Sequence, residues 1–311
     1  MFRKAYSTIW ENLVTAYQRE KLSHALLFSG PKGTAKEPLV FELIRLVGEI
    51  AVSDEVLKKG YHPDVLVVRP VVEKKKEKIR QKKISVEQLK PVMEKVGLYP
   101  YQAKKKIVLV LEAQEMSVGA ANSMLKLIEE PLSDTMIMLV ADNEEMLLPT
   151  ILSRCQKIRV GLLSDEKLKE LADSYVESQG LNRQGVSLED AVNYAHGRLE
   201  DSWKLLKDED FLAERKTMVD AFRDALRGDL SIGFSLAEKI ASDDVKIKEH
   251  LDEWIWYLRN FLKQNVKNKV DIRIQKKVFF MLKEMLEVRR MLEKTNVNER
   301  LFLENFFIKL K

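Results

Sequence analysis

Five short apolar runs in the first half of the chain set the strongest limit on its fold. They are rich in β-branched and long aliphatic residues, and they read "ALLFS" (25–29), "DVLVV" (64–68), "IVLVL" (107–111), "MIMLV" (136–140) and "KIRV" (157–160). Apolar residues do not alternate with polar ones inside these runs, so both faces of each strand should be covered. The pattern therefore predicts a parallel five-stranded sheet flanked by helices.

The segments between these runs have the periodicity of amphipathic helices. Ser85 and Gln88, for example, form a capping-box pattern at the start of one of them. Strands that alternate with helices predict an α/β domain over residues 1–162. No convincing strand pattern follows, so we expect a small helical section over residues 163–207 and an all-helical domain over residues 208–311.

The composition excludes several classes of protein. The 311 residues include 53 basic and 48 acidic side chains, a net charge of +5, and 45% of them are hydrophobic. The single cysteine, Cys155, excludes an internal disulfide and any zinc site built from a cysteine cluster. No apolar run approaches the roughly 20 residues that a membrane span needs, and the N-terminus lacks a signal-peptide core. We therefore expect a globular cytoplasmic protein that makes no use of a membrane.

The sequence "SGPKGTAKE" follows the first apolar run and has the outline of a phosphate-binding loop, G-x-x-x-x-G-K-[ST]. Gly30, Gly33 and Lys36 are candidate nucleotide-binding residues, because such loops surround phosphates with backbone N–H groups and a lysine. Two positions depart from the pattern. Ala35 replaces the last glycine, and Glu37 replaces the hydroxyl that would bind magnesium. We also expect Pro38 to disfavour helical geometry at the residue before it.

The second half of a hydrolytic site is altered as well. Working proteins of this architecture end a later strand in Asp-Glu, whereas the run "IVLVL" is followed by Glu112 and Ala113. Ala113 offers no base to polarise water. We interpret the loop as the structural relic of a nucleotide site, with no cofactor expected. Weak nucleotide binding without hydrolysis is the alternative, and true hydrolysis is the least favoured.

Arg154 lies just before the last predicted strand, in "LLPTILSRCQKIRV". Taken by itself, the sequence favours an ordinary surface arginine there, paired with Glu129 or Glu130. The alternative is an arginine that projects from the domain toward another molecule.

An ordered set of motifs resembles the AAA+ clamp-loader family of bacterial DNA polymerase III. The motifs are "LSHALLFSGPKGTAK", "HPDV" (62–65), "ANSMLKLIEEP" (122–131), "LLPTILSRCQ" (147–156) and "TNVNERLFLENFFIKL" (295–310). The resemblance covers most of the first 160 residues and returns at the C-terminus. It implies an AAA+ core with a helical lid and a collar domain through which five related subunits form a ring.

The resemblance also implies roles for residues. Arg154 would act in trans as an arginine finger at the ATP site of a neighbouring gamma/tau subunit, with Ser153 and Cys155 positioning it. The implied partners are the gamma/tau and delta subunits, with the sliding clamp and primed DNA reached through the assembled complex. Family members often carry a four-cysteine zinc module, but residues 48–61 contain no cysteine, so no metal is expected. The arginine expected three residues after Gly197 is replaced by Glu200, which argues against ATP sensing.

Two further segments leave alternatives open. The stretch from Arg69 to Lys83 holds eight basic and two acidic residues; we favour a solvated loop or flexible insertion over contact with DNA phosphates. The aromatic run around Trp254 and Tyr257 is interpreted as a core or interface stripe rather than a base-stacking surface. The resemblance and the altered loop together predict a non-hydrolysing clamp-loader subunit. Two other functions stay open: an ATP-hydrolysing gamma/tau-like motor subunit, and a stand-alone basic DNA-binding protein.

Overall fold

The computed structural model describes residues 2–75, 78–132, 134–180, 186–227, 230–241, 244–267, 271–294 and 298–309. Contacts group the chain into two compact units. The first consists of Met1–Val71 with Lys82–Lys207, and the second of Val72–Gln81 with Asp208–Lys311. The expected boundary between residues 162 and 163 falls inside the first unit and stays a prediction. Within the described ranges, no helix is both long and apolar enough to cross a membrane.

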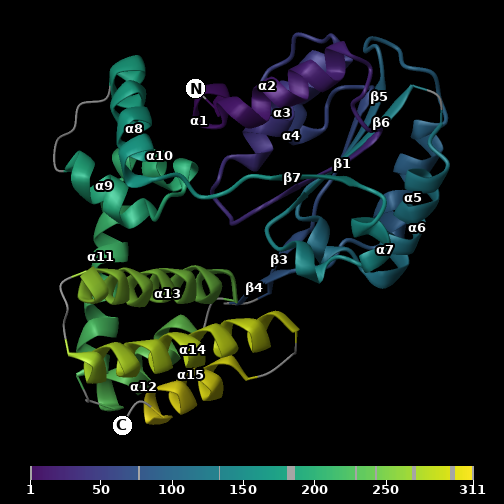
Figure 1. Cartoon of the computed structure of the whole chain (residues 1–311). Coiled ribbons are helices and arrows are strands. Elements are labelled where there is room, and N and C mark those ends of the chain that lie inside the picture. Colours follow the sequence, from purple (N-terminus) through teal and green to yellow (C-terminus); the bar gives the residue numbers. More distant parts are fainter. Residues whose placement is uncertain are drawn as a thin grey trace. The chain divides into compact units, whose positions relative to one another are not determined.

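A parallel five-stranded sheet forms the centre of the first unit (Figure 1). Its strands are β1 (Ala25–Ser29), β2 (Val65–Val68), β5 (Lys106–Val110), β6 (Thr135–Ala141) and β7 (Gln156–Arg159). They lie in the order β2-β5-β6-β1-β7, and every neighbouring pair is parallel. Each strand coincides with one of the five apolar runs, so the predicted sheet is confirmed. Strand β1 lies between β6 and β7, which brings the loop that follows it next to the ends of both.

Helices cover both faces of this sheet. Their bounds are α1 (Phe2–Ala5), α2 (Ser7–Gln18), α3 (Lys36–Gly48), α4 (Asp54–Lys59), α5 (Val86–Val96), α6 (Val118–Glu129) and α7 (Pro149–Leu152). Leu27, Val108 and Ile137 belong to a buried cluster with residues of α5 and α6. Neighbouring strand residues point to the opposite face, and α3 packs against β1, β5 and β6. Both faces are apolar because both are buried.

Polar side chains cap the starts of α5 and α6. The side chain of Ser85 accepts a hydrogen bond at the start of α5, and Gln88 Oε1 accepts one from Ser85 N at 3.0 Å, which completes the predicted capping box. Ser117 Oγ caps α6 by accepting from Ala120 N at 3.2 Å. Each cap satisfies backbone donors that have no partner inside the first helical turn.

Three further helices complete the first unit: α8 (Asp165–Gln179), α9 (Leu188–Ala195) and α10 (Leu199–Lys207). They form the region expected to be a lid. Trp203 stacks on Tyr175 with ring centroids 4.7 Å apart, and Phe2 of α1 meets the edge of Trp203 at 5.0 Å. These aromatic contacts attach the lid helices to the N-terminal segment of the same unit.

The second unit is mainly helical, as predicted. It contains α11 (Glu209–Leu226), α12 (Leu230–Ile240), α13 (Asp244–Lys267), α14 (Ile272–Lys294) and α15 (Glu299–Lys309). Trp254 is fully buried, stacks on Phe222 at 4.5 Å between ring centroids, and donates from Nε1 to Met218 O at 3.3 Å. Tyr257 packs against the same cluster. This part of the aromatic run forms core, whereas Phe261 is 38% exposed.

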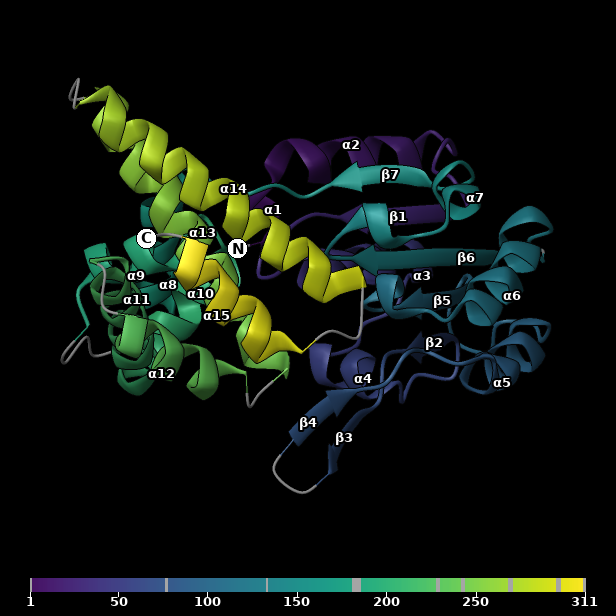
Figure 2. The same ribbon diagram turned by 90° about the horizontal axis from the view of Figure 1, so that it is seen from below.

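The basic stretch from Arg69 to Lys83 is not the loop that we favoured. Val72–Lys75 (β3) and Lys78–Gln81 (β4) form an antiparallel hairpin (Figure 2). At its base Lys82 N donates to Val71 O at 2.8 Å. The sequence did not predict these strands because lysine has little β propensity. Cross-strand backbone pairing, however, does not depend on an apolar side chain.

Asp64, in the "HPDV" motif, is a buried anchor of the first unit. Its carboxylate accepts hydrogen bonds from the backbone N–H groups of residues 101, 102 and 103 and from Lys106 Nζ, at 2.6–2.9 Å. Both charged side chains are nearly inaccessible to solvent. These four donors hold the pKa of Asp64 well below its usual range, although burial alone would raise it. The motif therefore fixes the loop that leads into β5.

Replacing Asp64 by asparagine should leave the Lys106 ammonium group buried opposite a neutral amide. We expect Asp64→Asn to lower the free energy of unfolding by about 3–5 kcal/mol at pH 7, as measured by urea unfolding. The folded-state pKa of Asp64 is lowered, so the wild-type contribution is complete above the unfolded value of 3.8 and is lost as the pH falls below it. The difference between the two proteins should therefore shrink in acid, and equal stability at pH 7 would contradict this role.

Candidate functional site

The loop after β1 keeps the backbone of a phosphate-binding loop. Gly30 has a φ of +152°, and a Cβ there would lie 2.0 Å from Val160 O, so no side chain fits. Gly33 has a φ of +81°. Ala35 also adopts the left-handed conformation, with a φ of +59°, at the position where the pattern has glycine. A residue with a Cβ loses about 1–2 kcal/mol in that conformation.

Lys36 is bound by the chain's own groups. Its Nζ donates to Gly30 O and Pro31 O, each at 2.7 Å, and forms an ion pair with Asp142 Oδ1 at 2.8 Å. Only 5% of the Lys36 side chain is exposed. The register explains the ion pair, because Ser29 pairs with Ala141 and the residues that follow β1 and β6 therefore meet at one edge of the sheet. Sequence reasoning missed Asp142, since neighbouring strands cannot be identified from one sequence.

Helix α3 begins at Lys36 and runs through Glu37 and Pro38. The expectation that Pro38 would disfavour helical geometry at Glu37 is therefore wrong. A proline is tolerated in the first turn of a helix because its missing N–H would have no partner there.

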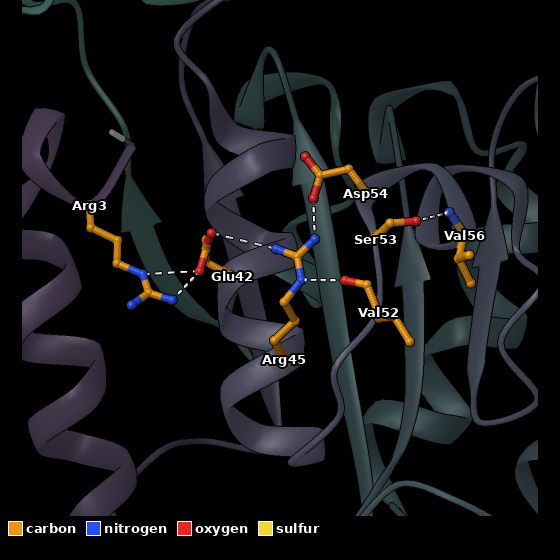
Figure 3. A network of polar contacts seen from close by, with 7 residues as sticks. All are labelled: Arg3, Glu42, Arg45, Val52, Ser53, Asp54 and Val56. Atoms are coloured by element: carbon orange, nitrogen blue, oxygen red, sulfur yellow. Dashed lines mark hydrogen bonds and ion pairs between the residues drawn. The ribbon is translucent and has the colours of Figure 1, made fainter. Parts of the chain in front are cut away.

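The far half of α3 is held by a network of charged side chains (Figure 3). Glu42 pairs with Arg3 of α1 and with Arg45, whose guanidinium also contacts Asp54 of α4 and donates from Nε to Val52 O at 2.7 Å. These contacts join three helices of the unit. They fix the helix that carries Lys36 and Glu37 at its start.

The lid contacts the phosphate-loop sequence directly. Glu200 N, at the start of α10, donates to Gly33 O at 3.0 Å. A Cβ at Gly33 would lie 3.0 Å from Asp201 Oδ1 and 3.3 Å from Arg198 Cβ. The first turn of α10 therefore covers Gly33. The absence of a side chain at Gly33 leaves room for this contact.

Two carboxyl groups are partly buried beside this contact. Burial raises the pKa of Glu200, and the neighbouring Glu37 raises it further. Burial likewise raises the pKa of Glu37, although Arg69 and Lys58 oppose the shift. Two carboxyl groups therefore lie beside the loop, where a phosphate-binding site needs positive charge.

The residues that follow β5 lie at the same end of the sheet as the loop after β1. Glu112 has a φ of +52°, and Ala113 is almost fully buried. Glu112 is close enough to Glu37 to raise the pKa of Glu37. The structure thus brings Gly30, Gly33, Lys36 and the sequence after β5 to one edge of the sheet, as the motif pattern predicts.

Arg154 lies away from that loop, between α7 and β7. Strands β1 and β7 are parallel, with Leu26 opposite Gln156. Arg154 therefore precedes the amino end of β7, whereas Gly30 follows the carboxyl end of β1. The strand from Leu26 to Gly30, four residues of about 3.3 Å each, alone puts about 13 Å between the two positions. Arg154 therefore lies too far from the loop of its own chain to serve it.

The side chain of Arg154 is 42% exposed. Its Nε forms an ion pair with Glu129 Oε1 at 2.7 Å, and Nη1 donates to Thr150 O and Ser153 Oγ at 3.2 and 3.3 Å. The ion pair with Glu129 agrees with the surface interpretation made from the sequence. Among the described residues, no hydrogen bond of Nη2 is formed.

Ser153 and Cys155 flank the arginine in different ways. Ser153 Oγ donates to Thr150 O at 3.0 Å and accepts from Arg154. Cys155 is buried in the core cluster beneath the sheet, and burial raises the pKa of its thiol to about 11. A thiol with that pKa is a packing group rather than a nucleophile.

The raised pKa of Glu200 predicts a stability effect with a definite sign. A carboxyl whose folded-state pKa is raised destabilises the fold once ionised, so its cost is absent below the unfolded value of 4.5 and develops as the pH rises through the folded value. Glu200→Gln should therefore raise the free energy of unfolding at pH 7, by an amount on the order of 1 kcal/mol, and change it little at pH 4. Urea unfolding at both pH values measures this. Glu189→Gln, at an exposed lid position, is the matched control, and equal effects of the two variants would contradict the burial argument.

The comparisons with known proteins agree with this geometry. The family model described as "DNA polymerase III, delta subunit" matches residues 6–163, just over half of the chain. The delta-prime subunit of Bacillus subtilis is 34% identical over 47% of this chain and 44% of its own length, and that of Pseudomonas aeruginosa is 32% identical over 44% and 43%. The chain thus spans less than half the length of these curated relatives.

A solved structure extends the likeness of fold to nearly the whole chain. It is a DNA polymerase III gamma subunit-related protein from Thermotoga maritima, 17% identical, with a TM-score of 0.51 over 96% of this chain and 98% of its own. At that identity the likeness concerns the fold alone. The family match, the delta-prime relatives and the five-stranded core together identify the chain as a member of the AAA+ clamp-loader family of DNA polymerase III subunits.

Proposed function

We propose that this chain is a non-hydrolysing, delta-prime-type stator subunit of the DNA polymerase III clamp loader. In this role it supplies Arg154 as an arginine finger to the ATP site of a neighbouring gamma/tau subunit. The observation that carries the proposal is the separation of the two groups: the lysine of the loop is held internally, while the exposed arginine lies at the opposite edge of the sheet.

The loop region does not fit a nucleoside triphosphate. Lys36 would have to leave two carbonyl oxygens and Asp142 to reach a phosphate. The first turn of α10, whose Glu200 N donates to Gly33 O, covers the loop, and the carboxyls of Glu37 and Glu200 would repel the phosphate charge. Ala113 offers no base. These four features support a structural relic with no bound cofactor, and they oppose the rival motor function.

Arg154 suits a role between subunits for a physical reason. A guanidinium that is exposed, and anchored through Nε and Nη1, can present its remaining donors to an anion on another molecule. At an ATP site an arginine finger contributes a factor of about 10³–10⁵ to the rate. An exposed ion pair such as that with Glu129 is worth only about 0–1 kcal/mol, so exchanging it for a phosphate costs little.

The remaining roles follow from the same proposal. Ser153 and Cys155 position the arginine, one by a hydrogen bond and the other by anchoring the backbone in the core. The partners are gamma/tau and delta subunits, and the sliding clamp and primed DNA are contacted through the assembled ring in the cytoplasm. No zinc or other metal is required.

Replacing Arg154 tests the finger. We expect a loader reconstituted with Arg154→Ala to assemble normally, because the residue is exposed, but to lose a factor of about 10³–10⁵ in turnover at the site that Arg154 serves. The measurement is ATP hydrolysis by the reconstituted ring with clamp and primed DNA, with assembly followed by gel filtration. Arg154→Lys should not restore the rate, because lysine lacks the planar donor fork.

The matched control is Arg159→Ala. Arg159, the last residue of β7, is 75% exposed and pairs with Glu144, so its loss should leave turnover near the wild-type value. Glu129→Ala removes the ion-pair partner of Arg154 and should also spare turnover. Wild-type hydrolysis by the ring with Arg154→Ala would exclude the finger.

Restoring the loop pattern should not restore an enzyme. We expect the double variant Ala35→Gly, Glu37→Thr to show no ATP hydrolysis as an isolated chain, because Ala113 still lacks a base and Lys36 is still bound to Asp142. A steady-state phosphate-release assay on the purified chain measures this. Magnesium-dependent turnover by the double variant would show that the residues at positions 35 and 37 alone prevent ATP hydrolysis.

A further inference from the structure

One short stretch of chain after β7 joins the core of the first unit to its lid. Val160 N donates to Ser29 O at 2.8 Å, so residue 160 still belongs to the sheet. Leu163 N donates to Gly197 O at 2.9 Å, so residue 163 already belongs to the lid. Between them, a Cβ on Gly161 would meet no atom of the described residues within 4 Å. Gly161 is therefore the hinge, a small and loosely packed residue about which a lid can turn.

The segment Phe2–Tyr6, called the strap below, contacts the lid. It consists of α1 and the residue that follows α1. The ring of Phe2 meets Trp203 of α10 in a T-shaped arrangement, with ring centroids 5.0 Å apart. Trp203 also stacks on Tyr175 of α8 at 4.7 Å. A single side chain of the strap is thus linked to two lid helices.

The other contacts of the strap hold it to the core and to the hinge. Arg3 forms an ion pair with Glu42 of α3 (Figure 3), and α1 packs on the same helix. Tyr6 is 7% exposed, and its hydroxyl donates to Gly161 O at 3.2 Å. The carbonyl group of the hinge residue is therefore bound by a buried side chain. Core, hinge and lid are all contacted by five consecutive residues.

We propose that the strap is a lock that holds the lid on the core without a nucleotide. A lid joined to a core through one hinge can rotate, and a second attachment removes that freedom. Turning the lid about Gly161 requires that Phe2 leave Trp203 or that the hydrogen bond of Tyr6 break. The lock rests on the proposed non-hydrolysing role, because a subunit that takes up no nucleotide has no ligand to set the position of its lid.

Hydrogen exchange of the purified full-length chain tests the lock. The double variant Phe2→Ala, Tyr6→Phe removes the aromatic contact and the hydroxyl group. Amides of α8, α9 and α10 should exchange about tenfold faster, because an aromatic contact and a hydrogen bond together change a local opening equilibrium by about that factor. Amides of β1, β5 and β6 should keep the wild-type rate. Tyr6→Phe alone, which keeps the ring in place, should give a smaller change with the same pattern.

Tyr17→Phe is the matched control. Its hydroxyl donates to Glu49 Oε1 at 3.2 Å, an exposed hydrogen bond that involves neither the hinge nor the lid. Lid exchange in this variant should equal that of the wild type. Three results would overturn the lock: wild-type lid exchange in the double variant, equal acceleration in the strands, or the same acceleration in the control.

Adding ATP with magnesium to the double variant separates the lock from the proposed function. Faster lid exchange that ATP leaves unchanged supports both. Faster lid exchange that ATP reverses supports the lock and contradicts the silent loop. Unchanged lid exchange overturns the lock and leaves the proposed role of Arg154 unaffected, because that role is measured by hydrolysis in the assembled ring.

Discussion

The three contacts of Lys36 Nζ are the interaction on which the first unit depends. A lysine at the start of a helix, beside a loop with inward-facing carbonyl oxygens, needs anionic compensation. In nucleotide-binding proteins a phosphate supplies it. Here the Asp142 carboxylate supplies it from within the chain, and Gly30 O and Pro31 O accept the other hydrogen bonds of Lys36 Nζ. Under the proposed function, the strand–loop–helix geometry needs no ligand, and the helix that the loop begins serves as a permanent part of the core.

The contact between the lid and the loop follows from the same substitution of internal groups for a ligand. Glu200 N bonds to Gly33 O, and Phe2 and Tyr175 hold Trp203 nearby. In a nucleotide-driven protein the ligand couples the lid to the core, so its loss releases the lid. In this chain the backbone makes the coupling itself. Under the proposed stator function, this chain would keep one internal shape while neighbouring subunits change theirs.

The sequence predicted those features that depend on local composition. The five strands are buried on both faces, so their apolar runs are continuous, and the Ser85–Gln88 cap is a local hydrogen-bond pattern. Features that depend on neighbours in space were missed. Asp142 meets Lys36 only because β6 pairs with β1, and nothing in the run of lysines indicates that β3 and β4 pair with each other. For Arg154 the sequence left two interpretations open, and the ion pair with Glu129 is compatible with both, since a weak surface pair is readily exchanged.

The central claim is that the nucleotide site of this chain has been replaced by its own side chains and backbone. Its most direct test is equilibrium binding of ATP with magnesium to the purified wild-type chain, free of other subunits. Because Lys36 is engaged and two carboxyls adjoin the loop, the account predicts no saturable binding up to about millimolar ATP, a limit of about −4 kcal/mol in binding free energy. Saturable magnesium-dependent binding at micromolar concentrations would contradict it.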